Sequence, residues 1–184
     1  MKKFAILAAS LFAIATLASA QMGMSHDKSK RPSPPASAAC KFSDGKAIKV
    51  DYSSPRAKGR KIFGEASEKA LVPYGQVWRT GANEATTFVT DTNLTVGGKA
   101  VPAGSYTIFT IPKADAWTLV ISKKTSEWGT DYPGEKEDLA RVPMSVSKTS
   151  VPAENFTIAF DQAGGKCTLR MEWENTRASV EITK

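Results

Sequence analysis

The sequence predicts an all-β fold: an antiparallel β-sandwich or flattened barrel of roughly nine or ten short strands. Apolar and polar residues alternate with a period of two through much of the chain, while helical periodicity is nearly absent. Turn-forming residues recur about every 8–12 residues, as in sandwiches and barrels. Residues 106–111 and 117–121 are apolar on both faces, which indicates central strands covered on each side. At most one short helix is expected, at residues 65–71.

The first 20 residues have the parts of a cleavable secretory signal. A lysine pair precedes an apolar run over residues 4–17, and the small residues Ala18 and Ala20 lead into a cleavage point. The run is shorter than the roughly 20 residues that span a bilayer. We therefore expect a periplasmic or secreted protein that begins at Gln21 and has no membrane span after cleavage.

Residues 21–39 are rich in proline, serine and alanine and lack hydrophobic periodicity, which predicts a disordered tether. Residues 40–184 then form a single β domain, since no linker divides them. Met22, Met24 and His26 are soft metal ligands, but they lie in the tether, and an unstructured segment preorganises no site. We expect no bound metal and no cofactor.

Two glycine pairs, at residues 97–98 and 164–165, predict tight hairpins. The second pair places Phe160 opposite Leu169, and a one-residue slip would move both side chains to the wrong face. A further two-residue loop at residues 175–176 then makes the C-terminal third a three-stranded meander.

Cys40 and Cys167 are the only cysteines. In an exported protein an even number predicts a disulfide, here one that stabilises by up to about 4–5 kcal/mol. Cys167 falls on the core face by alternation. The face of Cys40 depends on the turn at residues 44–45, because a two-residue loop there would place it opposite Lys49. Two free thiols, or two thiol ligands of a metal, are the alternatives.

The formal net charge of +7 is concentrated in the first third of the chain, and residues 56–61 form the densest basic stretch. Such a stretch attracts an anionic envelope component, or is a solvated loop. No aromatic residues are interleaved with it, so nucleic acid is not an expected partner.

Signatures of catalysis are scarce. The single histidine, His26, lies in the predicted tether, which removes Ser-His-Asp triads from the domain. Paired carboxylates for glycoside hydrolysis remain open, although nothing singles out two at the required separation. The loop carboxylates are Glu65, Glu84, Glu127, Asp131 and Glu135. Whether the protein is an enzyme is left open, and the sequence favours a negative answer.

Two segments, residues 74–84 and 128–134, combine aromatic, amide and charged residues between glycines. Ligand-binding clefts use such combinations. We expect the two segments to meet at one end of the sandwich and form a polar-aromatic pocket. The alternative is loop packing, in which Arg79 and Glu84 form a buried pair. The candidate ligand-binding residues are Trp78, Arg79, Asn83, Glu84, Trp128 and Tyr132.

The same segments carry a family resemblance. The runs KGRKIFG at residues 58–64, LVPYGQVWRTGANEATTF at 71–88 and VPAGSYTIFTIP at 101–112 resemble secreted bacterial proteins catalogued as domain of unknown function 2911. The similarity extends from about Cys40 to the end of the chain. The resemblance implies a bacterial envelope setting and carries over no activity and no catalytic residues.

The sequence therefore favours an exported, non-catalytic β-sandwich module that binds a ligand or partner in the bacterial envelope. An anionic envelope component or a small ligand is the expected partner. The alternatives are an envelope glycan hydrolase that uses two loop carboxylates and a purely structural envelope protein. Carboxylates facing each other across a cleft would favour the hydrolase, and full burial of Trp78 and Trp128 would favour the structural role.

Overall fold

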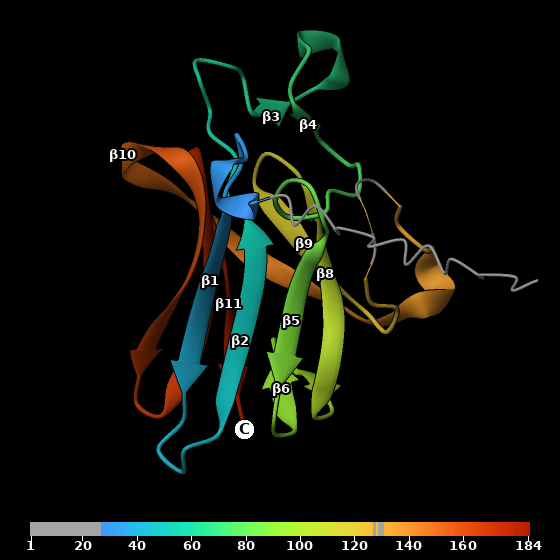
Figure 1. Cartoon of the computed structure of the whole chain (residues 1–184), viewed down its shortest axis with the longest axis vertical. Coiled ribbons are helices and arrows are strands. Elements are labelled where there is room, and N and C mark those ends of the chain that lie inside the picture. Colours follow the sequence, from blue (N-terminus) through green and yellow to red (C-terminus); the bar gives the residue numbers. More distant parts are fainter. Residues whose placement is uncertain (1–26, 127, 129–130) are drawn as a thin grey trace, which may run out of the picture.

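A computed structural model of the chain describes residues 27–126, 128 and 131–184 (Figure 1). The predicted signal, the expected start at Gln21 and the soft ligands Met22, Met24 and His26 lie outside the described residues, as does Glu127.

The described residues form eleven strands and three short 3-10 helices. In chain order the strands are β1 (Pro35–Lys41), β2 (Ala47–Ser53), β3 (Phe63–Gly64), β4 (Val72–Pro73), β5 (Thr86–Thr90), β6 (Leu94–Val96), β7 (Lys99–Val101), β8 (Gly104–Pro112), β9 (Ala116–Ser122), β10 (Asp138–Ala163) and β11 (Lys166–Thr183). The 3-10 helices are η1 (Lys28–Lys30), η2 (Ala66–Glu68) and η3 (Glu135–Glu137). Of the helix predicted at residues 65–71, only the single turn η2 forms.

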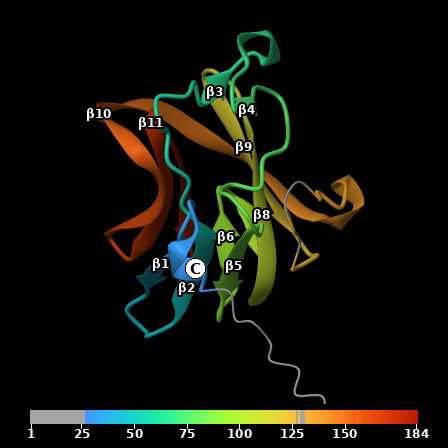
Figure 2. The same cartoon turned by 45° about the horizontal axis from the view of Figure 1, so that its top comes forward.

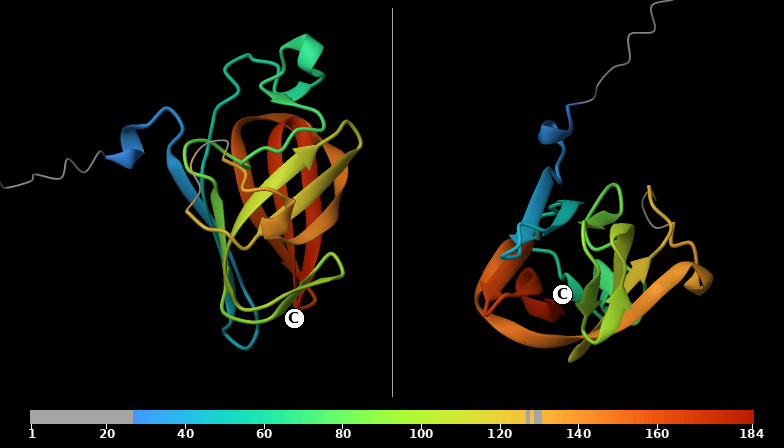
Figure 3. Two further views of the ribbon diagram at one scale, coloured as in Figure 1. Left: turned by 90° about the vertical axis from the view of Figure 1, so that its right-hand side faces the viewer. Right: turned by 90° about the horizontal axis from the view of Figure 1, so that it is seen from below.

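Nine strands form one antiparallel sheet in the order β1-β2-β5-β8-β9-β10-β11-β6-β7, and β3 pairs with β4 separately. The sheet curls around its own core without closing into a barrel (Figure 3). The all-β antiparallel prediction is confirmed. The strands are not all short, however, because β10 runs for 26 residues. It pairs with β9 over residues 138–145 and with β11 within residues 145–163.

The prediction of a three-stranded C-terminal meander is correct for the first turn, at residues 164–165, and wrong for the second, at residues 175–176. Phe160 pairs with Leu169 as expected. Residues 175–176 do not adopt the left-handed conformation that a two-residue hairpin loop requires, so β11 continues through them. Ala178 therefore lies opposite Val146 of β10 rather than folding back onto its own strand.

The two segments predicted to be apolar on both faces are β8 and β9, and they lie inside the sheet between β5 and β10. On the inner face, Ile108 and Leu119 are fully buried in the main core. On the outer face, Phe109 and Val120 form a second buried cluster, which Val77 and Tyr132 cover from the loops. A strand apolar on both faces thus has a covered outer face, as expected.

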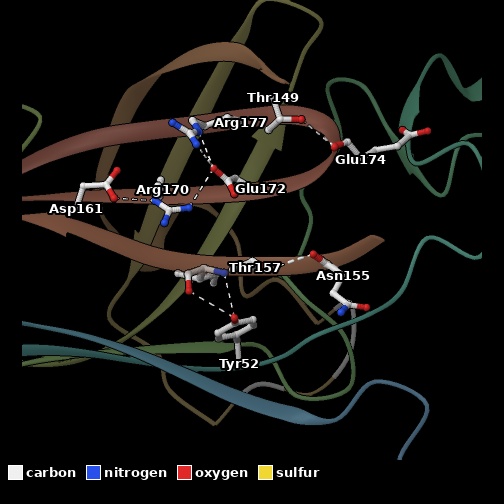
Figure 4. Close-up of polar contacts among 10 residues, drawn as sticks. Tyr52, Thr149, Asn155, Thr157, Asp161, Arg170, Glu172, Glu174 and Arg177 are labelled. Carbon is white, nitrogen blue, oxygen red and sulfur yellow. Dashed lines mark hydrogen bonds and ion pairs between the residues drawn. The ribbon is translucent and has the colours of Figure 1, made fainter. Parts of the chain in front are cut away.

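The second half of β10 lies beside β1 and β2 without forming a strand ladder with them. We call this junction the seam, and other contacts join its two sides. The Tyr52 hydroxyl of β2 accepts a hydrogen bond from the Ile158 amide at 3.0 Å and donates one to the Ile158 carbonyl at 3.4 Å (Figure 4). Residues 54–57 continue along residues 154–156 through backbone hydrogen bonds. Unpaired edge groups invite pairing with other chains, and these contacts occupy them.

The predicted Cys40–Cys167 disulfide is present, with Cα atoms 6.2 Å apart, and it joins β1 to β11 across the same seam. Cys40 faces the core because the turn after β1 has three residues, 43–45, with Gly45 at a φ of +86°. That turn aligns Cys40 with Ile48 instead of Lys49.

The prediction of a disordered tether over residues 21–39 is wrong for residues 35–39, which belong to β1. Residues 35–39 pair with residues 49–53 of β2. Ala36 and Ala38 alternate toward the core, where small side chains fit beside the curled sheet. Pro35 is tolerated because β1 is an edge strand, where no partner needs its amide hydrogen.

Candidate functional site

The connection between β2 and β5, residues 54–85, lies over one end of the sheet and carries β3, η2 and β4 (Figures 1 and 2). A cavity of about 430 Å³ opens beneath this connection. Residues 71–83 form most of its wall, and Ser33, Arg60 and Trp173 contribute from other parts of the chain.

Trp78 forms the inner wall of the cavity and belongs to the core. Its side chain is 9% exposed, and its indole nitrogen donates a hydrogen bond to the Gly81 carbonyl at 3.1 Å. Its ring stacks on Trp173 with centroids 5.8 Å apart and meets Phe156 edge-on at 4.8 Å. Trp78 therefore closes the core beneath the cavity and positions the turn that follows.

Arg79 follows in a backbone segment held rigidly against β8. The backbone of Trp78 exchanges hydrogen bonds of 2.8 and 2.9 Å with Thr110, and the hydroxyl of Thr80 lies 3.1 Å from that of Thr110. Thr80 has a φ of +57°, a left-handed conformation that costs a β-branched residue about 1–3 kcal/mol. Such strain concentrates at functional sites, and here it fixes the direction in which the chain presents Arg79.

Arg79 lines the cavity and does not form the buried pair with Glu84 that the packing alternative required. Its Nε atom is buried without a hydrogen-bond partner, and no ion pair joins its guanidinium to any described residue. Burial lowers the pKa of Arg79 from its ordinary value, but a guanidinium remains charged in proteins. None of the described residues that line the cavity is acidic. The cavity thus holds a cation without a counter-charge.

Asn83 and Glu84 instead bind the segment that precedes β1. Asn83 donates a hydrogen bond to the Ser33 carbonyl at 3.1 Å. Glu84 accepts hydrogen bonds of 3.0 and 2.9 Å from Arg31 and lies 3.0 Å from the Lys28 ammonium. Burial raises the pKa of Glu84, but hydrogen bonds from its own backbone and from these two cations outweigh burial and hold the pKa at about 2.

The second predicted segment does not join the cavity. Trp128 is 57% exposed and makes an isolated backbone bridge to Glu84. Tyr132 packs edge-on against Phe109 on the outer face of the sheet, with centroids 5.3 Å apart. The six candidates therefore do not form one pocket: Trp78, Arg79 and Asn83 line the cavity, and the other three lie elsewhere. A ligand-binding role for any of them stays a prediction.

The loop carboxylates proposed for a hydrolase are dispersed. Glu84 is ion-paired as described, and Glu135 lies 3.1 Å from the Arg141 guanidinium. Glu65 and Asp131 are exposed, and neither lines the cavity. No two of these described carboxylates share a pocket around the Arg79 guanidinium.

The cavity residues that sequence reasoning missed include Ser33 and Arg60. Ser33 fell within the predicted tether, so no site was expected there. Arg60 lies in the basic stretch over residues 56–61, whose charge was visible in the sequence, but only the fold places it beside residues 71–83. The approach of Arg60 to residues 71–83 depends on the folded chain, and no local pattern in the sequence predicts it.

Residues 33–182 match the family described as protein of unknown function DUF2911. The chain belongs to this family. The match begins at Ser33, just before β1, so it includes the strand that sequence reasoning had assigned to the tether. The family's description assigns no activity. A search of the curated proteins and a search of the solved structures each returned no match.

Two further observations concern the described part of this family member. No helix within it is long and apolar enough to cross a membrane. The residues described also include no group of three or more His, Cys, Asp or Glu side chains arranged to hold a metal ion.

Proposed function

We propose that this DUF2911 protein is an exported, non-catalytic β module that binds a small anionic ligand in the bacterial envelope, with Arg79 as the anchor. The observation that carries the proposal is the Arg79 guanidinium, which lines a cavity without a carboxylate partner among the described residues. A partly buried cation without a partner is destabilising. A carboxylate or phosphate on a ligand would supply that partner through two parallel hydrogen bonds.

The cavity has the size and composition of a small-molecule site. Its volume of about 430 Å³ lies within the range of ligand pockets, about 300–1,000 Å³. Val77 and Trp78 supply apolar wall, and Gln76 and Asn83 supply amide groups. Leu71 at the rim is 45% exposed. These groups suit a ligand with one acidic group on a compact, partly apolar body.

Two features support the envelope as the setting. The N-terminal 20 residues have the pattern of a cleavable export signal. The Cys40–Cys167 disulfide requires an oxidising compartment to persist, which the cytoplasm of most bacteria does not provide.

The rival functions receive less support. A hydrolase needs two carboxylates at a defined separation around its substrate, and the cavity wall supplies none from the described residues. A purely structural role is favoured by the burial of Trp78 but not by Trp128, which is 57% exposed. It also leaves the unpaired Arg79 without a purpose.

The proposal is tested by titrating the mature protein with N-acetylmuramate and orthophosphate and recording backbone amide NMR shifts. N-acetylglucosamine, which lacks the lactyl carboxylate of N-acetylmuramate, is the uncharged control. We expect one or both anions to shift the amides of residues 71–83 and the neutral sugar to leave them unchanged. Arg79→Met should abolish these shifts, whereas Arg177→Met, on the outer face of β11, should preserve them. Equal responses to charged and neutral probes, or no response at all, would refute the proposal.

A further inference from the structure

The seven arginines of the chain divide into two groups. Four of them, Arg31, Arg141, Arg170 and Arg177, form ion pairs with carboxylates. Figure 4 shows Arg170 and Arg177 on either side of Glu172, at 3.0 and 2.5 Å. The other three, Arg56, Arg60 and Arg79, have no carboxylate partner among the described residues, and all three lie at the same end of the molecule.

These three arginines line two adjoining depressions. Arg79 and Arg60 line the cavity of about 430 Å³. Arg60 and Arg56 line a neighbouring depression of about 270 Å³ together with Lys58. Ser33 and Arg60 belong to both walls, so the depressions meet at these residues. Four cations therefore follow one another from the inside of the cavity to the surface outside it.

The guanidinium groups of Arg56 and Arg60 are held in place by neutral acceptors. Arg60 donates hydrogen bonds to the backbone carbonyls of Ala57 and Arg56, and Arg56 donates one to the Asn155 side chain at 2.8 Å. The backbone amide of Lys58 donates a hydrogen bond to the Glu154 carboxylate at 2.9 Å, which fixes this turn against β10. These contacts orient the side chains of Arg56 and Arg60 without an ion pair to neutralise them.

Lys61, the next basic residue, is different. It forms an ion pair with Glu68 of η2. If the basic loop were simply solvated, nothing would explain why Lys61 is neutralised by an ion pair while the cations nearer the cavity are not. The unneutralised charge is confined to the side of the loop that continues from Arg79.

We infer that the natural ligand carries at least two acidic groups: one binds Arg79 inside the cavity, and a second binds Arg56, Lys58 and Arg60 outside it. This inference rests on the proposed function and names the class of ligand. The class is an oligomeric or polymeric acid whose phosphate or carboxylate groups repeat along a chain. One unit enters the cavity, and the chain continues over Ser33 to the outer depression. Linking two acidic groups raises affinity because the second contact forms at a high effective concentration.

The test compares monomeric and oligomeric acids by isothermal titration calorimetry on the mature protein. Orthophosphate and tripolyphosphate form the phosphate arm, and galacturonate and trigalacturonate form the carboxylate arm. In the correct arm we expect the oligomer to bind at least about tenfold more tightly than the monomer. The double variant Arg56→Gln, Lys58→Gln should lower the affinity for the oligomer to that for the monomer and so remove this ratio.

The matched control, Lys46→Gln with Lys99→Gln, removes the same charge from two exposed residues, one in the turn between β1 and β2 and one at the start of β7. It should keep the ratio. The inference is overturned if neither oligomer binds more tightly than its monomer, or if the Arg56, Lys58 variant keeps the ratio. If either result is found but the monomers still bind and their binding requires Arg79, the proposed function stands without the further inference. If no probe binds the wild-type protein, the inference falls, and the proposed function is then decided by the N-acetylmuramate titration.

Discussion

Arg79 at the cavity and Arg141 on the outer face of the sheet show two opposite environments for the same side chain. Arg141 binds Asp138 at 2.7 Å and Glu135 at 3.1 Å, and it donates a hydrogen bond to the Tyr132 hydroxyl at 2.9 Å. Its hydrogen bonds to Asp138 and Tyr132 raise the pKa of Arg141 above its ordinary value. Burial lowers the pKa of Arg79, which has no such partners.

The two regions have similar composition, with an aromatic residue, an arginine and acidic residues near glycines. In the Tyr132 region the acids bind the arginine, and the cluster stabilises the fold. In the Trp78 region the nearest acid in sequence, Glu84, binds Arg31 and Lys28 instead. The comparison teaches that a site-like arginine is identified by where the neighbouring acids point, and composition does not reveal that.

The largest difference between the two regions should appear at their tryptophans. Trp78→Ala removes a ring packed on Trp173 and Phe156, and we expect a loss of about 3–5 kcal/mol in the free energy of unfolding. Trp128→Ala removes an exposed ring and should change stability by less than about 0.5 kcal/mol. Denaturant unfolding of both variants measures the contrast. Similar losses would mean that Trp128 is as much a core residue as Trp78.

The two arginines should respond to the same substitution in different directions. Arg141→Met leaves Asp138, whose side chain is 8% exposed, without its cation, and should destabilise by about 1–3 kcal/mol. Arg79→Met removes an unpaired charge from a cavity and should leave stability unchanged or raise it slightly. Melting temperatures of the two variants in the same buffer give the comparison. A strong loss of stability in Arg79→Met would show that this arginine is structural.

The smallest effect concerns the Glu84 contacts that hold residues 27–34. Because the folded pKa of Glu84, about 2, lies below the ordinary value of 4.5, its ion pairs stabilise the fold above pH 4.5. That stabilisation is lost as the pH falls from 4.5 to about 2. The side chain is 37% exposed, so solvent screening limits the effect to below about 1 kcal/mol.

The variant Glu84→Gln tests this directly. Its stability should fall below that of the wild type at neutral pH, and the two curves should converge toward pH 2. High salt should reduce the difference, since the ion pairs are partly exposed. A difference that persists at pH 2 would assign the effect to the shape of the side chain rather than to its charge.

The features that sequence reasoning predicted correctly have local signals. The two-faced apolar pattern of β8 and β9 follows from burial on both sides of a central strand. The hairpin at residues 164–165 needs glycines at left-handed positions, and both have positive φ. The disulfide followed from the number of cysteines and the expected compartment.

The features that it missed depend on contacts between distant segments. Strand β1 contains proline and alanines, which have low intrinsic strand preference, and it forms because β2 and the core accept them. The continuation of β11 through residues 175–176 depends on its pairing with the first half of β10. Likewise, the cavity forms where Arg60 and Ser33 approach residues 71–83, and no spacing in the sequence encodes that approach.

The disulfide across the seam has a consequence for biosynthesis. Cys40 and Cys167 are 127 residues apart, so Cys40 leaves the ribosome long before its partner exists. At common synthesis rates of about 5–20 residues per second, the interval is roughly 6–25 s. During that time the thiol of Cys40 has no partner within the chain with which to form the disulfide. Oxidative folding of this chain can therefore finish only after its last hairpin has been made.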